Sequence, residues 1–234
     1  MELDRVEAAV DDGDTDLGAL GFWRLVRRVK RDPDLIERHA DRIGRIDRKA
    51  FQAGVRIRIP TWAGDLLLTT VLAVGAMSFA VAASSAEGSL VTGIALVVAM
   101  GAWDVGVHSP THRLVGRLVG IRFTEYFVRS IAAPPGVKTD YTSYLRASPS
   151  ARAWMHASGA LASKVVPFLV IVLASVFDVD APAWAIAIVW VVGVGQIFTD
   201  AIFSTRRSDW KKVRRELAVA RDLRRPAGAR ATLS

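Results

Sequence analysis

The chain has 234 residues, no cysteine and a formal net charge of +8, and 51% of its residues are hydrophobic. The lack of cysteine excludes disulfide bonds, thiolate metal ligands and a cysteine nucleophile. The apolar content is higher than a soluble domain of this length needs, and it indicates a membrane protein.

Residues 1–60 are predicted to form a cytoplasmic segment that mixes acidic and basic side chains. Within it, residues 20–31 set Leu, Phe, Trp and Val among Arg and Lys, which is the pattern of a short amphipathic helix. Such a helix could lie on anionic lipid or pack on its own protein. From Val55 to Ile59 apolar residues alternate with arginine, as in a short strand, and Pro60 ends this pattern.

Four long apolar blocks follow, each close to the roughly 20 residues that cross a bilayer as a helix. They contain few charges, and they predict an all-α membrane protein whose residues 61–203 form a bundle of four transmembrane helices. The blocks run from Trp62 to Ala83, from Leu90 to Val107, from Ala160 to Phe177 and from Ala183 to Phe203.

Lys and Arg indicate how these helices are oriented. They concentrate in residues 1–60, 113–157 and 204–234, whereas the short links Ser84–Gly88 and Asp178–Pro182 contain none. Because cytoplasmic segments accumulate Lys and Arg, both termini are expected in the cytoplasm, in a multi-pass protein of the cell membrane. Topology thus explains the positive charge, and the expected partner is the lipid bilayer, with no nucleic acid.

The longest cytoplasmic connection is expected over residues 109–157. Within it, Ile121–Val128 has a strand-like composition and is followed by a Pro-Pro-Gly turn, so a small cytoplasmic β-hairpin is predicted near residues 121–138. After the last span, residues 204–234 are predicted to form a basic, largely helical cytoplasmic tail.

Ionisable side chains inside a membrane span are costly and need an explanation. His108 and Asp200 lie near the cytoplasmic ends of the second and fourth spans, at nearly equal depth. His112 follows His108 by one turn, so both imidazoles project from the same face of a continuous helix. Two histidines and a carboxylate form a common zinc set, so His108, His112 and Asp200 are the predicted zinc ligands. Asp104, one turn before His108, and His156, just before the third span, are predicted to support these ligands.

Ser109 and Pro110 leave an alternative open. Serine followed by proline is a common helix start, and a new helix beginning there would turn the two histidines to different faces. Histidines near a membrane boundary also often only form hydrogen bonds. The same polar residues could therefore pair among themselves in a membrane scaffold or a transporter-type subunit without metal.

Two stretches resemble the site-2 protease family of intramembrane zinc metalloproteases. His108–Val128, HSPTHRLVGRLVGIRFTEYFV, is similar to the HExxH helix of that family and the strand that follows it. Met155–Phe168, MHASGALASKVVPF, is similar to the segment in which a glycine motif starts the next core helix, and Asp200, in QIFTD, takes the place of the aspartate ligand. The resemblance implies a zinc-dependent protein that holds a membrane protein or peptide partner as a strand added along Ile121–Val128.

The chain departs from the family's pattern: Asp200 is not followed by glycine, the asparagine expected in the glycine motif is missing, and so is the glutamate of HExxH. The HExxH glutamate, which serves that family as general base, is replaced by Ser109, whose hydroxyl is not a base near neutral pH. The resemblance therefore implies one of two things. The chain is a catalytically degenerate pseudoprotease that binds a partner, or it is a hydrolase in which Asp104 or Glu125 supplies the base.

Overall fold

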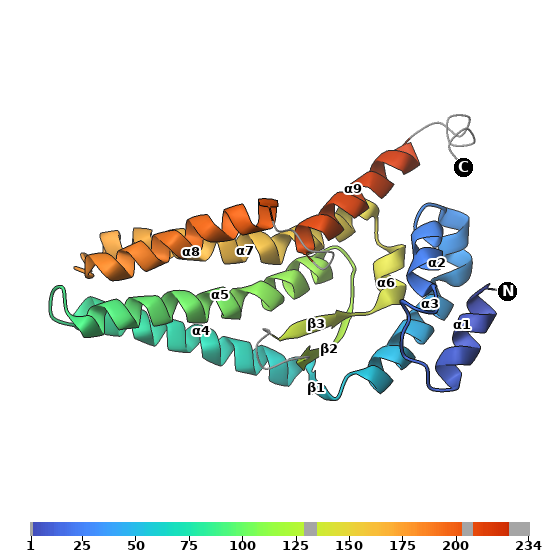
Figure 1. Cartoon of the computed structure of the whole chain (residues 1–234), viewed down its shortest axis with the longest axis horizontal. Coiled ribbons are helices and arrows are strands. Elements are labelled where there is room, and N and C mark those ends of the chain that lie inside the picture. Colours follow the sequence, from blue (N-terminus) through green and yellow to red (C-terminus); the bar gives the residue numbers. More distant parts are fainter. Residues whose placement is uncertain (1, 129–134, 203–207, 225–234) are drawn as a thin grey trace. The chain divides into compact units, whose positions relative to one another are not determined.

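The computed structural model describes residues 2–128, 135–202 and 208–224, except for the side chains of residues 200–202. The described residues are mostly helical, with one small sheet, as Figure 1 shows. The elements in chain order are α1 (Glu2–Asp11), α2 (Phe22–Val29), α3 (Pro33–Gly54), β1 (Ile57–Pro60), α4 (Thr61–Ser84), α5 (Leu90–Leu118), β2 (Phe123–Val128), β3 (Gly136–Thr139), α6 (Tyr141–Arg146), α7 (Pro149–Val176), α8 (Ala183–Ile202) and α9 (Asp209–Arg224).

The chain divides into two compact units, and each is described by itself. The first, called the sheet unit, contains α1 to α3, α6 and the three strands. The second, called the apolar-helix unit, contains most of α4, α5 and α7 together with α8. The sheet unit comprises Met1–Thr61, Gly116–Trp154 and Val213–Ser234, and the apolar-helix unit comprises Trp62–Val115 and Met155–Lys212.

The amphipathic helix predicted over residues 20–31 forms as α2. Its apolar residues Phe22, Val26 and Val29 are buried in the hydrophobic core of the sheet unit. Side chains from α1, α3 and α6 complete this core. The apolar face of α2 therefore packs on its own protein, which decides between the two alternatives left open by the sequence.

The predicted hairpin is confirmed, and a third strand extends it. β2 pairs antiparallel with both β1 and β3, so the strand order is β1-β2-β3. β1 forms from the alternating segment before the first apolar helix, close to where the sequence predicts a strand. Because β2 has a neighbour on each side, the expectation that Ile121–Val128 offers an open edge for a bound strand is wrong.

A buried ion cluster lies in the sheet unit. Oε1 of Glu216 accepts hydrogen bonds from Nζ of Lys30 at 2.5 Å and from the Tyr144 hydroxyl at 2.9 Å. Its Oε2 accepts from Nε of Arg152 at 2.6 Å, and Arg152 is fully buried and also donates to two backbone carbonyls. Burial raises the pKa of Glu216, but Lys30 and Arg152 outweigh this effect and hold the pKa below its ordinary value. The charges of Glu216, Lys30 and Arg152 thus stabilise one another in a buried place, where water does not solvate them.

Three helices among the described residues are long and apolar enough to cross a membrane. They are α4, α5 and α7, with 24, 29 and 28 residues. The described part of α8 contributes a shorter apolar stretch, Ala183–Thr199. Large apolar side chains face outward on these helices, such as Met77 with 69% and Val191 with 71% of its surface exposed. This outward apolar surface is expected for helices surrounded by hydrocarbon.

Two of these helices are longer than the apolar blocks that predict them. α5 continues past Val107 to Leu118, and α7 begins at Pro149, well before Ala160. Both therefore extend into residues 109–157, which the sequence suggests as a connecting loop. An apolar block marks the part of a helix that avoids water, whereas the backbone hydrogen bonds continue where the side chains become polar.

Glycines allow close approach between the helices of the apolar-helix unit. Trp103 of α5 lies against Gly75 of α4, and its indole Nε1 donates to the carbonyl of Leu72 at 3.2 Å. In the same way, Gly193 of α8 faces the ring of Phe168 on α7. Small residues at such contacts favour helix association in membranes, where hydrophobic burial gives no driving force.

Replacing Glu216 by Gln is expected to lower the free energy of unfolding by about 3 kcal/mol, because two buried cations lose their counter-charge. Urea unfolding in detergent micelles measures this loss. The exposed Glu37→Gln variant is the control and should change stability by less than about 0.5 kcal/mol.

The same pair of variants tests the pKa of Glu216. A lowered folded-state pKa stabilises the fold above the ordinary glutamate value of 4.5, and this contribution is lost as the pH falls further. The Glu37→Gln protein should show this loss on acidification, and the Glu216→Gln protein should not. Identical acid-side behaviour of the two would contradict the assigned role of Glu216.

Candidate metal site

Helix α5 presents two histidines on one face. It runs without a break from Leu90 to Leu118 and includes Pro110 within it, so no new helix begins at Ser109. His108 and His112 consequently project from neighbouring turns. Their ring centroids are 4.7 Å apart and the rings meet edge to face.

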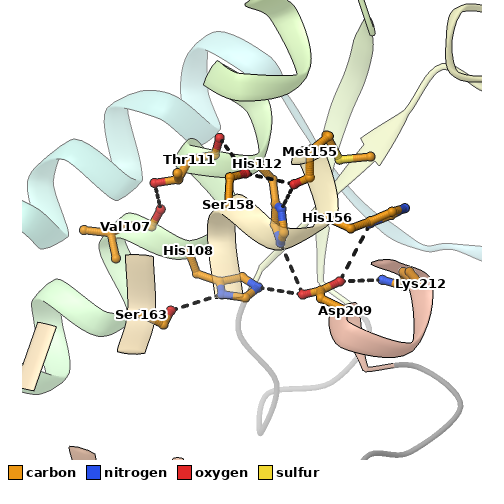
Figure 2. Close-up of polar contacts among 10 residues, drawn as sticks. All are labelled: Val107, His108, Thr111, His112, Met155, His156, Ser158, Ser163, Asp209 and Lys212. Carbon is orange, nitrogen blue, oxygen red and sulfur yellow. Dashed lines mark hydrogen bonds and ion pairs between the residues drawn. The ribbon is translucent and has the colours of Figure 1, made fainter. Parts of the chain in front are cut away.

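The third group is Asp209, the first residue of α9. Its Oδ2 lies 3.4 Å from Nε2 of His108 and 3.2 Å from Nε2 of His112, as Figure 2 shows. An acidic residue suits this place because the N-terminus of a helix favours negative charge. The side chains of His112 and Asp209 are 10% and 17% exposed, and that of His108 is more open at 32%.

Hydrogen bonds on the far side of each ring orient the imidazoles. Nδ1 of His112 lies 2.6 Å from the carbonyl oxygen of Met155, and Nδ1 of His108 lies 3.1 Å from Oγ of Ser163. A carbonyl can only accept, so Nδ1 of His112 carries a proton and donates it. In the neutral ring, Nε2 of His112 then presents a lone pair to Asp209. Metal-bound histidines are typically fixed by such a contact to a backbone carbonyl.

The three facing atoms need a positive charge between them. With His112 neutral, its lone pair faces a carboxylate oxygen at 3.2 Å, and two acceptors at that distance repel. A proton on Nε2 of His112 alone would make this contact a charge-assisted hydrogen bond, whereas protonating both His108 and His112 would place two cationic rings 4.7 Å apart. One divalent cation removes both repulsions, because it accepts a lone pair from each histidine and from Asp209.

Two of the ligand separations match those of a zinc site. Zinc–ligand bonds of about 2.0–2.1 Å in a tetrahedral arrangement place neighbouring ligand atoms about 3.3 Å apart. The two separations from Oδ2 of Asp209 are 3.4 and 3.2 Å, and one ligand atom from each residue lies within 4.8 Å of the others. Two histidines and one carboxylate are also a donor set of catalytic zinc sites, which keep one position open. His108, His112 and Asp209 could therefore hold a metal ion.

The other oxygen of Asp209 faces two basic groups. Nζ of Lys212 lies 2.8 Å from Oδ1, and Nδ1 of His156 lies 3.9 Å from it (Figure 2). Burial raises the pKa of Asp209, but its hydrogen bonds with His108 and His112 outweigh this effect and hold the pKa well below its ordinary value. The carboxyl group is therefore ionised at neutral pH, as a metal ligand must be.

A polar cleft of about 280 Å³ opens beside His108, between side chains of α5, α7 and α8. Ser163 and Lys164 line it from α7. Gln196 of α8 and Asp104 of α5 also line it, and Nε2 of Gln196 donates to Oδ2 of Asp104 at 3.5 Å. Oδ1 of Asp104 and Oε1 of Gln196 are buried and have no hydrogen-bond partner within the described part of the chain. Because these two hydrogen-bond acceptors are unpaired, we expect the cleft to bind a molecule with hydrogen-bond donors, such as water or an amide.

The site residues predicted from the sequence differ in how close they lie to the histidine pair. His108 and His112 lie together, as their spacing suggests, and His156 approaches from α7. Asp104 lines the cleft and accepts a hydrogen bond from Gln196 of α8, so its role in supporting the ligands stays a prediction. Asp200 belongs to α8, but its side chain lies outside the described residues, so its role as a zinc ligand stays a prediction.

Asp209 is the residue that sequence reasoning missed. It lies in the tail, which the sequence shows as a basic helix, and the charge pattern drew attention to the arginines and lysines around it. The available signal was an isolated acid at a helix start, preceded by Ser208 and surrounded by basic residues. The depth of Asp200 along the fourth span favoured that residue instead, because sequence periodicity does not show where the residues after the span lie.

No family model matches this chain, and no match was found among characterised proteins or solved structures. The site therefore has to be judged from its own geometry and chemistry. The arrangement of His108, His112 and Asp209 and the cleft beside them are the observations available for that purpose.

Replacing Gly159 by Ala is expected to weaken zinc binding at least about tenfold, in line with the loss of an orienting contact at other metal sites. Gly159 lies on α7 against the histidines, and a Cβ there would overlap the ring of His112 and lie 2.7 Å from the carbonyl oxygen of His108. Competition with a chelator of known affinity measures the change.

The matched control is Gly101→Ala on α5, where an added Cβ has nothing within 4 Å. This variant should keep the zinc affinity of the wild type and gain up to about 1 kcal/mol of helix stability. Zinc affinity unchanged in Gly159→Ala would show that the ring of His112 is not a ligand.

Proposed function

We propose that this chain is an integral membrane zinc metalloprotein of the site-2-protease type, with its zinc near the cytoplasmic side of the membrane. His108, His112 and Asp209 are the ligands, and Asp200 is the alternative third ligand. The observation that carries the proposal is the lone pair of His112, which is turned toward the carboxylate of Asp209 by the hydrogen bond to Met155. That pairing is repulsive unless a proton or a metal cation lies between the two groups.

Zinc with three protein ligands supplies Lewis-acid chemistry at its open position. The chain's own part is to admit and orient a substrate through the cleft beside His108. Asp104 and Gln196 offer two unpaired acceptors there, which suit the N–H groups of a peptide. A peptide segment is therefore the substrate or partner that the cleft fits best.

Asp104 is a better candidate for the missing base than Glu125. Asp104 lines the same cleft as His108. Glu125 belongs to β2 in the sheet unit, where it lies 3.7 Å from Arg58. Ser109, at the position of the family's glutamate, is buried and offers no basic group.

Ser109 also favours a second candidate function. A pseudoprotease would keep the zinc site as a structural element and use the cleft to hold a membrane protein or peptide without cleaving it. A scaffold without metal is the remaining alternative. In it, a protonated His112 would form an ion pair with Asp209, and a neutral His108 would donate from Nε2 to Asp209 and accept at Nδ1 from Ser163.

The proposal includes four membrane spans, α4, α5, α7 and α8, in a multi-pass protein of the cell membrane. Both termini would then face the cytoplasm. Residues 84–88 and 178–182, which join the spans in pairs, contain no Lys or Arg, and the long segments on the other side are rich in both.

Single cysteines can test this topology, because the chain has none of its own. Glu87→Cys and Asp180→Cys should react with a membrane-impermeant maleimide on intact cells. Glu37→Cys and Asp222→Cys should react only after permeabilisation. Reaction of Glu87→Cys but not Asp180→Cys on intact cells would show that α7 and α8 do not form a second hairpin across the membrane.

Elemental analysis of the detergent-purified protein, without a histidine tag, tests the proposed function directly. The wild type should contain about one zinc ion per chain, as a three-ligand site predicts. His108→Ala, His112→Ala and Asp209→Ala should lose it. His39→Ala, which removes a histidine of α3 outside the site, is the matched control and should keep it. Loss in Asp200→Ala together with retention in Asp209→Ala would move the third ligand to Asp200.

A casein-derived fluorogenic peptide then separates enzyme from pseudoprotease. Zinc-dependent cleavage that is lost in Asp104→Asn, while zinc is retained, would identify Asp104 as the base. No cleavage by the zinc-loaded protein would favour the pseudoprotease. A wild type without zinc, as stable as its variants, would remove the zinc proposal and leave the scaffold.

A further inference from the structure

A basic cavity of about 510 Å³ lies in the sheet unit and shares no residue with the candidate metal site. Arg48 and Gln52 line it from α3, Arg56 from the segment just before β1, Arg58 from β1 and Thr124 from β2. Residues four apart on a helix, or two apart on a strand, share a face. α3 and the β1 segment therefore each direct a pair of side chains into the same space.

The cavity has an excess of positive charge. Glu125 also lines it and lies 3.7 Å from Arg58, and Arg48 donates to Asp140 at 3.1 Å. Even when both carboxylates are set against the three guanidinium groups, one positive charge is left over. Arg56 is exposed and has no hydrogen bond or ion pair within the described residues, so it is available to a ligand.

A buried hydroxyl also lacks a partner at this place. The pairing of β2 with β3 shifts between Phe123 and Glu125, which makes Thr124 the extra residue of a β-bulge. Its Oγ1 is buried and has no hydrogen-bond partner among the described residues. An unpartnered buried hydroxyl costs stability, and bulges often redirect a side chain toward a site. An anion in the cavity could accept a hydrogen bond from it.

The chain enters the first apolar helix at this cavity. Pro60 lines it, and the next residue, Thr61, begins α4, which is long and apolar enough to cross a membrane. Guanidinium groups bind phosphate oxygens in pairs, and basic residues beside a span attract anionic lipid headgroups. We propose that the cavity binds the phosphate group of an anionic phospholipid, with Arg56 and Arg58 as its main cations and Thr124 as a hydroxyl donor.

Native mass spectrometry of the full chain in a neutral detergent tests this site. The protein is titrated with phosphatidylglycerol, and inorganic phosphate is then added as a competitor. The wild type should retain phosphatidylglycerol. The double variant Arg56→Gln/Arg58→Gln should bind it about thirtyfold more weakly, because each basic residue near an anionic headgroup contributes about fivefold.

Arg27→Gln/Arg28→Gln is the control, because it removes the same charge from exposed positions on α2. It should bind phosphatidylglycerol as the wild type does. Thr124→Val keeps the shape of the side chain but removes the hydroxyl, so it should bind a few-fold more weakly without losing stability. A Thr124 with only a structural role would leave binding unchanged.

Two outcomes support the site and distinguish its ligand. Displacement of the lipid by inorganic phosphate shows that the phosphate group itself is recognised, and lipid binding that resists phosphate shows a requirement for the whole headgroup. Two outcomes overturn it. The first is that neither phosphatidylglycerol nor inorganic phosphate binds the wild type. The second is that Arg27→Gln/Arg28→Gln loses as much affinity as Arg56→Gln/Arg58→Gln, which would indicate attraction to net charge alone.

Discussion

An ionised side chain in apolar surroundings must find its counter-charge inside the protein. Glu216 meets this requirement through Lys30 and Arg152, whose nitrogens lie 2.5 and 2.6 Å from its two carboxylate oxygens. Asp209 meets it differently, because Lys212 faces its Oδ1 while His108 and His112 face its Oδ2. The cluster around Glu216 needs no further ion, whereas the groups around Asp209 leave a position for a metal ion.

The histidine pair depends on the continuity of α5. Proline within a helix removes one hydrogen bond and usually bends the chain, and Pro110 lies between the two histidines. Because the helix continues, His108 and His112 still share a face, and the absence of a side chain at Gly159 lets α7 approach them closely. α7 then supplies both orienting contacts, from Met155 and Ser163. α5 and α7 thus orient both imidazoles without a contribution from Asp209.

Sequence patterns predicted the features that depend on local periodicity. Apolar blocks located α4, α5 and α7, alternation located β1, and a four-residue spacing placed His108 beside His112. Features that depend on contacts between distant segments were not predictable in this way. Hydropathy reports where side chains avoid water, so it did not predict that α5 continues to Leu118. Nor does any local pattern show that Arg152 and Glu216, 64 residues apart, are partners.

Strand order is a further case of the same limit. The composition of residues 121–138 predicts a hairpin but does not indicate which strand is central. The central position of β2 follows from β1, a segment more than sixty residues earlier in the chain, whose Ile57 pairs with Val128. For this reason β2 offers no free edge for peptide capture, and the polar cleft beside His108 is the better candidate for a bound peptide.

The order of the ligands along the chain has a consequence for biosynthesis. Asp209 follows His112 by 97 residues, and two apolar helices lie between them. At a synthesis rate of about 5–20 residues per second, the ribosome needs about 5–20 s to reach the carboxylate after it has made the histidines. During that time α5 carries only two of the three proposed ligands. A bound zinc ion would therefore mark a chain in which α9 has already been made and has brought Asp209 to the histidines, so that zinc acquisition is a late step in maturation.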